Sequence, residues 1–313
     1  NSQDATVDHL ASVLKAGSVQ SLRFDTDTCL CKSRVSFVGG KPCLIYEDTA
    51  FFPSAFTAVW YRRPERLKHA DIADTPEGKF VLDEWSEAFE GFFAHIPKSR
   101  WMNHPSANAA ASHKLEQITA AAGLGFLLPE TLLTQDAVEL RAFYARHQGK
   151  IIAKPLARGY VERAEGETDT LIYTNPVSAE DLTALDDLSA CPTLFQELID
   201  KRTDVRITVV DEDIHAVEML AEDESGTQRC DIRRNNMQDV RYQTISLPVE
   251  VASRVRALMR HYQLRFAAID MVVSKAGDWI FLEVNPNGQW AWLDLVGATN
   301  IADSFVRSFR GGS

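Results

Sequence analysis

Two carboxylates and one amide near the C-terminus have the spacing of a metal site. Asp270 lies in one stretch that alternates apolar and polar residues, and Glu283 and Asn285 lie in a second such stretch. Carboxylates that face each other destabilise a sheet unless a positive charge lies between them. Three oxygen ligands without a thiol or an imidazole suit a hard ion such as Mg²⁺, which shares phosphate oxygens with a nucleotide. The alternative is a solvated acidic face, and the spacing alone leaves both open.

The two stretches are predicted to form a β-hairpin that turns at Ala276-Gly277. If Lys275 pairs with Asp278, the ladder is regular, with 273 opposite 280, 272 opposite 281, 271 opposite 282 and 270 opposite 283. Asp270 then faces Glu283, and Asn285 projects from the same face because strand side chains repeat every second residue. The opposite face is predicted to be core and consists of Ile269, Met271, Val273, Ile280, Leu282 and Val284.

Two lysines are candidates for binding a phosphate. Lys154 ends an apolar run and precedes Pro155, which leaves its ammonium at the edge of a loop. Lys114, on a predicted helix, could supply a second point charge. The alternative for either lysine alone is a solvated surface position.

Arginines form another candidate group. Asp204 and Arg206 share a face of a predicted strand, and Arg233 and Arg234 are neighbours in an acidic chain. Arginine binds carboxylates and phosphates through paired hydrogen bonds and stabilises negative charge that develops in a reaction. The alternatives are an ion pair between Asp204 and Arg206, and an arginine pair in a loop exposed to water.

The composition bounds the kind of protein. The chain has 313 residues and a formal net charge of −11, which argues against a broad surface for nucleic acid or anionic membranes. No apolar run reaches the roughly 18 residues that a membrane span needs, and no signal peptide is recognisable. We therefore expect a cytoplasmic protein. Its five cysteines, an odd number without metal-binding spacing, are predicted to be free thiols.

Helices and strands alternate along the predicted fold. The apolar periodicity predicts helices over 4–16, 78–96, 114–123 and 248–262. Besides the hairpin at 265–288, it predicts strands over 21–25, 34–38, 43–46, 56–61, 131–133, 150–154, 171–174, 193–199, 206–210 and 214–220. A polar break at Asn103-His104-Pro105-Ser106 marks a domain boundary. We expect three domains, over 1–103, 104–199 and 200–313.

Several motifs resemble a known family. Lys154 after a strand, Gln196-Glu197-Leu198-Ile199 as a hinge, and Asp270 followed by Glu283-Val284-Asn285 are similar in order and spacing to the ATP-grasp ligases. Over nearly the whole chain, the sequence resembles the microviridin-type peptide maturases, or graspetide macrocyclases. The motifs that carry this resemblance are Arg23-Phe24-Asp25-Thr26-Asp27, Trp60-Tyr61-Arg62-Arg63-Pro64, Asp204-Val205-Arg206, Asp231-Ile232-Arg233-Arg234 and Asn285-Pro286-Asn287-Gly288-Gln289-Trp290.

The resemblance implies a fold and a set of roles. The fold would be α/β (α+β), an ATP-grasp fold with an N-terminal pre-ATP-grasp domain and ATP bound between the central and C-terminal modules. Lys114 and Lys154 would contact the ATP phosphates, and Glu197, Leu198 and Ile199 would hold the adenine. Asp270, Glu283 and Asn285 would bind Mg²⁺. Ala268 is a departure, since some ATP-grasp branches have an arginine there; Arg206, Arg233 and Arg234 would stabilise the charge instead, and Asp204 would orient Arg206 or the attacking hydroxyl.

The resemblance also implies a reaction. The γ-phosphate of ATP would pass to a Glu or Asp side chain of a ribosomally made precursor peptide, and a Ser/Thr hydroxyl or a Lys amine of that peptide would attack the acyl phosphate. Ester and amide both follow from this intermediate, so both stay open. A homodimer and a leader segment in the precursor are family expectations. The alternatives are a ligase that adds a free amino acid or amine to a carboxylate, and an inactive binding protein.

Overall fold

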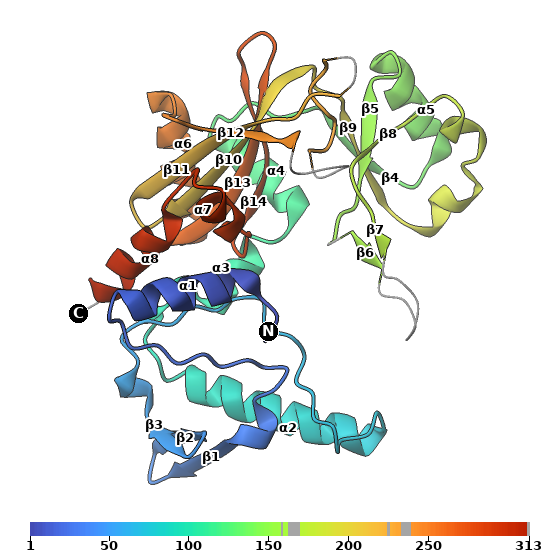
Figure 1. The fold of residues 1–313 in the computed structure, drawn as a ribbon. Helices are drawn as coiled ribbons and strands as arrows, with labels where there is room; N and C mark the ends of the chain where they lie inside the picture. The colour runs from blue at the N-terminus through green and yellow to red at the C-terminus, as the bar shows by residue number, and fades with distance from the viewer. Residues whose placement is uncertain (158, 162–169, 224–225, 233–238, 312–313) are drawn as a thin grey trace.

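The folded elements form three groups in space. The computed structural model describes residues 1–157, 159–161, 170–223, 226–232 and 239–311. Figure 1 shows a first group around β1 to β3 and α2, a large sheet around β10 and β13, and a smaller sheet around β4 and β5. Helix and strand are mixed throughout, as predicted, and the sheets are antiparallel.

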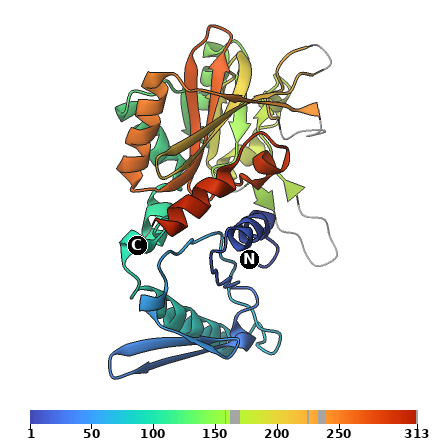
Figure 2. The same ribbon diagram turned by 60° about the vertical axis from the view of Figure 1, so that its left-hand side comes forward.

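The first group contains a three-stranded sheet and two helices. Its elements are α1 (Ala5–Ala16), β1 (Ser33–Val38), β2 (Lys41–Tyr46), β3 (Thr49–Phe51) and α2 (Pro76–Phe93). The predicted helices and the β1–β2 hairpin are confirmed, and the turn between the strands has both Gly39 and Gly40 at positive φ. Asp4 caps α1, which packs against α7 and α8 of the large sheet's group rather than against α2 (Figures 1 and 2).

Two predicted strands of this group are wrong. Residues 21–25 form no strand, and Arg23 there makes ion pairs with Asp8 and Asp25. In 56–61, only Val59 pairs, through an isolated bridge to Trp101. Phe24, Phe56 and Trp60 of these segments pack into apolar clusters without pairing as strands, and alternation of residue types cannot distinguish such a role from that of a strand.

The large sheet has five strands in the order β12-β11-β10-β13-β14. Its elements are β10 (Lys201–Val210), β11 (Asp213–Leu220), β12 (Arg241–Ile245), α6 (Val249–Tyr262), β13 (Phe266–Ser274), β14 (Trp279–Asn285), α7 (Ala291–Leu295) and α8 (Ile301–Arg310). Helices α3 (Pro105–Ala110) and α4 (Lys114–Gly123) pack against α6 and β14 respectively. The predicted helix over 248–262 and the hairpin around Asp211-Glu212-Asp213 are confirmed.

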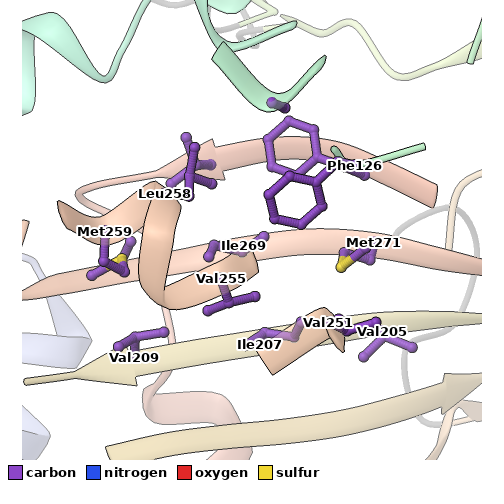
Figure 3. Close-up of a cluster of buried hydrophobic side chains, with 14 of the residues drawn as sticks. Phe126, Val205, Ile207, Val209, Val251, Val255, Leu258, Met259, Ile269 and Met271 are labelled. Atoms are coloured by element: carbon purple, nitrogen blue, oxygen red, sulfur yellow. The ribbon is translucent and has the colours of Figure 1, made fainter. Parts of the chain in front are cut away.

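The two faces of this sheet differ. One face packs against α6 through a large apolar cluster. Figure 3 shows labelled members of this cluster from the strands, from α6 and from the segment after α4: Phe126, Val205, Ile207, Val209, Val251, Val255, Leu258, Met259, Ile269 and Met271. On the other face, Phe266 packs against Phe305 of α8, beside the fully buried Trp290. That apolar packing covers only one end of the face, and the other end carries polar side chains.

The smaller sheet has the strand order β4-β9-β5-β8. Its group, called here the central lobe, contains β4 (Thr131–Thr134), α5 (Ala137–Arg146), β5 (Ile151–Lys154), β8 (Asn175–Pro176) and β9 (Thr193–Glu197). A two-stranded ribbon of β6 (Tyr160–Val161) and β7 (Thr170–Leu171) extends from it, so the predicted strand over 171–174 is mostly absent. Among the described residues, the buried apolar core of the lobe is small: Leu140, Phe143, Ile151, Ile152, Leu194 and Phe195.

The β13–β14 hairpin forms, with a register that differs from the predicted one near its turn. Val273 lies opposite Trp279 and Met271 opposite Phe281, one position away from the regular ladder. A bulge between Met271 and Asp270 absorbs one residue of β14, Leu282, and restores the pairing of Asp270 with Glu283. The prediction that Leu282 is a core residue is therefore wrong: Phe281 is fully buried and Leu282 is half-buried. The predicted face of Ile280 is wrong too, because Ile280 lies opposite Val272 and so shares the face of Asp270.

Two further expectations concern the chain as a whole. The five cysteines are free thiols, as predicted. In the described ranges, no helix combines the length and the apolar character that crossing a membrane would require.

Candidate active site

A row of charged side chains crosses three strands at the polar end of the large sheet. Arg206 of β10 lies opposite Asp270 of β13, which lies opposite Glu283 of β14, so all three project from the same face. The Arg206 Nε is 2.8 Å from a carboxylate oxygen of Asp270. Asn285, opposite Ala268, follows two positions along the same face. The predicted meeting of Asp270, Glu283 and Asn285 is therefore present.

Two lysines from other elements reach this row. Lys114, the first residue of α4, has its Nζ 3.4 Å from Glu283 and donates a hydrogen bond to the Pro155 carbonyl at 2.9 Å. Burial by itself would raise the pKa of Glu283, but Lys114, Lys154 and Arg206 hold that pKa below its usual value. Burial lowers the pKa of Lys154, while Glu283 and Asp270 oppose that shift. The predicted phosphate lysines and the acidic hairpin thus form one electrostatic unit.

The acidic residues fit a magnesium ion by their chemistry. Asp270 and Glu283 face each other, and Asn285 adds an amide oxygen, so the donor set contains only oxygen. Arg206 and Lys114 now supply the positive charge that the two carboxylates need. Among the residues that the structure describes, no cluster of three or more His, Cys, Asp or Glu side chains forms a competing metal site.

The predicted adenine hinge lies at the end of β9, next to β5. Glu197 pairs with Ile151 and Leu194 pairs with Lys154, so the hinge and the lysine occupy opposite ends of the same strand pair. Three residues of strand separate them, roughly 10 Å. The Leu198 amide donates to the Lys150 carbonyl at 2.8 Å, which fixes the hinge backbone. A nucleotide can bridge this distance, with its base at the hinge and its phosphates near Lys154.

Asp204 and Arg206 do not pair with each other. Asp204 accepts hydrogen bonds from Lys201 at 2.7 Å and from Gln228 at 2.8 Å. Burial raises the pKa of Asp204, and these two donors only partly oppose the shift. Lys201 and Gln228 are site neighbours that the sequence did not reveal. A bulge at the start of β10 brings Lys201 and Asp204 together, and strand alternation does not predict that contact.

Arg233 and Arg234 lie outside the described residues. Their neighbour Asp231 is described and buried, and it accepts a hydrogen bond from the Thr174 amide at 3.4 Å. This contact joins the segment before the arginine pair to the central lobe. Because the Cys230 carbonyl also accepts a hydrogen bond from Lys201 of β10, this segment contacts both the large sheet and the central lobe.

Comparison with known proteins supports the assignment of the fold. No protein-family model matches the chain, and no curated protein does so either. Several solved structures are similar over almost the entire length, among them two macrocyclases and an ATP-grasp ligase. The macrocyclase MdnC from Microcystis aeruginosa MRC, bound with precursor peptide MdnA, is 26% identical with a TM-score of 0.85, covering 100% of this chain and 97% of that one.

The other two structures are equally relevant. A Chryseobacterium gregarium RiPP-associated ATP-grasp ligase, in complex with ADP and a leader and core peptide, is 25% identical with a TM-score of 0.86, covering 99% of this chain and 95% of that one. The macrocyclase MdnB from Microcystis aeruginosa MRC is 25% identical with a TM-score of 0.76, covering 98% and 95%. The resemblance seen in the motifs is thus confirmed: the chain has an ATP-grasp fold and is similar over almost its entire length to macrocyclases and a peptide-binding ATP-grasp ligase.

Proposed function

We propose that this protein is an ATP-dependent peptide macrocyclase. It would form ester or amide crosslinks between Glu or Asp side chains and Ser, Thr or Lys side chains of a ribosomally made precursor. The observation that carries this proposal is the half-buried row Arg206–Asp270–Glu283 beside Lys114, in a chain similar over almost its full length to two macrocyclases. The site handles anionic phosphates in an otherwise acidic protein.

The first step transfers a phosphoryl group. A carboxylate oxygen of the peptide attacks the γ-phosphorus of ATP, the bond to the β-phosphate oxygen breaks, and ADP leaves. Lys114 and Lys154 would bind the phosphates as point charges, and Glu197 to Ile199 would hold the adenine. Asp270, Glu283 and Asn285 would hold Mg²⁺, which when bound neutralises charge on the nucleotide phosphates.

The second step closes the ring. A hydroxyl or amine of the peptide attacks the acyl carbon, the carbon–oxygen bond to phosphate breaks, and inorganic phosphate leaves. Arg206 would stabilise negative charge on the acyl and phosphate oxygens. The nucleophile loses a proton, and Asp204 is our candidate to accept it, because it shares a face with Arg206 and its pKa is raised.

Several finer assignments belong to this proposal. We infer a precursor with a leader segment and a core rich in acidic and hydroxyl side chains, a homodimer, and a location in the cytoplasm. Arg233 and Arg234 stay candidates for the acyl phosphate. The three domains, 1–103, 104–199 and 200–313, also remain proposed, with ATP bound between the second and third.

The decisive experiment supplies a candidate precursor peptide. We would incubate it with the protein, ATP and Mg²⁺ and follow its mass. Each crosslink should remove one water from the peptide, with ADP and phosphate formed in equal amounts. A gain in mass in the presence of free amino acids would instead support the amino-acid ligase. Absence of nucleotide binding in calorimetry would support the inactive binding protein.

A further inference from the structure

The motif Trp60 to Pro64 of the first group reaches the loop that follows the acidic hairpin. Arg62 is 7% exposed, and its Nη1 donates hydrogen bonds of 2.8 Å to the carbonyls of Asn287 and Gly288. Arg63 donates to the same Asn287 carbonyl at 2.9 Å. One buried side chain thus joins residues more than two hundred positions apart in the chain.

Two other groups hold the Arg62 guanidinium in place. The Asp4 carboxylate, next to α1, lies 3.1 Å from its Nε, and the Trp60 ring lies 5.3 Å from its central carbon. Burial alone would raise the pKa of Asp4, yet Arg62 keeps that pKa below its usual value. Burial lowers the pKa of Arg62 to about 10, against the pull of Asp4. Such a desolvated cation is retained only where its partners are well placed.

The loop in question connects two parts of the candidate site. It starts at Asn285, a proposed metal ligand, and includes Gln289, whose carbonyl accepts a hydrogen bond of 3.4 Å from Arg206. Asn103 donates to the Pro286 carbonyl at 3.1 Å. A displacement of this loop would therefore move both the Asn285 side-chain amide and the Gln289 carbonyl that binds Arg206.

We propose that Arg62 is a positioning residue for the metal end of the nucleotide site: through its two carbonyl contacts and the Asp4 pair, the first group of elements fixes the loop from Asn285 to Gln289. This inference rests on the proposed function. Lysine cannot replace arginine there, because one ammonium on a flexible stem lacks the planar set of donors that serves Asp4 and two carbonyls at once.

The test measures nucleotide binding rather than turnover. Isothermal titration calorimetry of the full chain would give the Kd for ADP with excess Mg²⁺ and with EDTA. Their ratio is the gain in affinity due to the metal. For Arg62→Lys we expect that ratio to fall about tenfold, the lower end of the loss seen when groups supporting metal ligands are changed. The Kd in EDTA should change less than twofold, since the hinge and the lysines are untouched.

Arg100→Lys is the matched control. Arg100 also lies in the first group and donates from its Nη1 to two carbonyls, those of Ser54 at 3.3 Å and Phe56 at 2.9 Å, neither of which belongs to the loop from Asn285 to Gln289. It should lower the unfolding midpoint in urea as Arg62→Lys does but leave the metal ratio unchanged. An unaltered ratio in Arg62→Lys, or an equal loss in both variants, would overturn the proposal.

A second variant keeps the question decidable if Arg62→Lys does not fold. Asp4→Asn retains an oxygen to cap α1 but removes the charge that holds Arg62, so we expect about a threefold loss of the metal ratio. No loss would overturn the proposal. Wild-type protein that shows no metal effect on ADP binding would instead refute the proposed function, which separates the two failures.

Discussion

At the residue scale, the candidate site consists of half-buried charges that compensate one another. Glu283 faces Lys114 and Lys154, and Arg206 faces Asp270. Removing one member leaves half-buried partners uncompensated, which costs more than an exposed ion pair contributes. The same compensation explains how the hairpin accommodates Asp270 and Glu283, two carboxylates that face each other across the ladder.

Glu283→Gln tests the metal assignment. The amide keeps the shape of the side chain but removes one charged oxygen ligand and the counter-charge of both lysines. We expect ATP-dependent turnover to fall by about 10²-fold or more, while far-ultraviolet circular dichroism stays native. Glu250→Gln, an exposed position in the first turn of α6, is the control and should retain full turnover. Undiminished turnover in Glu283→Gln would remove this residue from the site.

Gly288→Ala tests how tightly the loop after the hairpin packs on β13. A Cβ at Gly288 would lie 2.2 Å from the Ala268 Cβ, so the loop or the strand must move. We expect a loss of about 1–3 kcal/mol in the free energy of unfolding. Ala268 must therefore be small for steric reasons, and an arginine, which some ATP-grasp branches have at this position, would collide with the loop here.

The matching variant is Ala268→Gly, which removes the other methyl group. Alone it should destabilise the strand by about 0.5–1 kcal/mol. Combined with Gly288→Ala it should restore stability and the effect of Mg²⁺ on ADP affinity, because the collision is gone. Additive losses in urea unfolding of the double variant would show that the two positions do not touch.

At the element scale, the bulge in β14 decides which side chains face the core. It places Phe281 against Phe126, with ring centroids 5.2 Å apart, and leaves Leu282 half-buried. Phe281→Ala should therefore cost about 3–5 kcal/mol in unfolding free energy. Leu282→Ala should cost less than about 1.5 kcal/mol, because part of its surface is already exposed. A larger loss from Leu282→Ala in urea unfolding would favour the regular ladder over the bulge.

The same bulge marks the limit of prediction from sequence. Alternation located both strands, the turn and the Asp270–Glu283 pairing, because a buried face strongly constrains which residues point inward. It could not locate the bulge. The bulge keeps the Asp270–Glu283 pairing but offsets by one residue all pairings between it and the turn. Contacts such as Lys201 with Asp204 and Arg62 with Gly288 depend on a bulge and on tertiary packing, which leave no periodic trace.

The resemblance supplied what periodicity lacked. No residue pattern alone related Lys154 to Glu283, since they lie on different sheets and far apart in sequence. The family motifs predicted their association, and the structure shows their electrostatic coupling. Residues 21–25 and 56–61 show the converse error, because Phe24, Phe56 and Trp60 there pack into apolar clusters and the segments do not join a sheet.

At the scale of the whole molecule, the site lies between two lobes with cores of unequal size. The large sheet has apolar packing on one face and at one end of the other, while the central lobe has a much smaller apolar cluster around Phe143 and Ile151. Contacts between them include the Lys114–Pro155 and Thr174–Asp231 hydrogen bonds. Because few apolar contacts support it, the central lobe should open more readily than the large sheet.

Hydrogen exchange can test this difference and the location of the nucleotide together. Without nucleotide, amides of β5 and β9 should exchange faster than those of β10 and β13. ADP with Mg²⁺ at about 100 times its Kd adds about 2.7 kcal/mol to the state that binds it, so exchange through opening of the central lobe should slow by about 100-fold. Amides of β1 and β2 lie away from the site and serve as the internal control. Equal protection of β5 and β13 amides in the free protein would contradict the predicted difference in stability between the lobes. If saturating nucleotide did not slow exchange of the β5 and β9 amides, ATP would bind elsewhere.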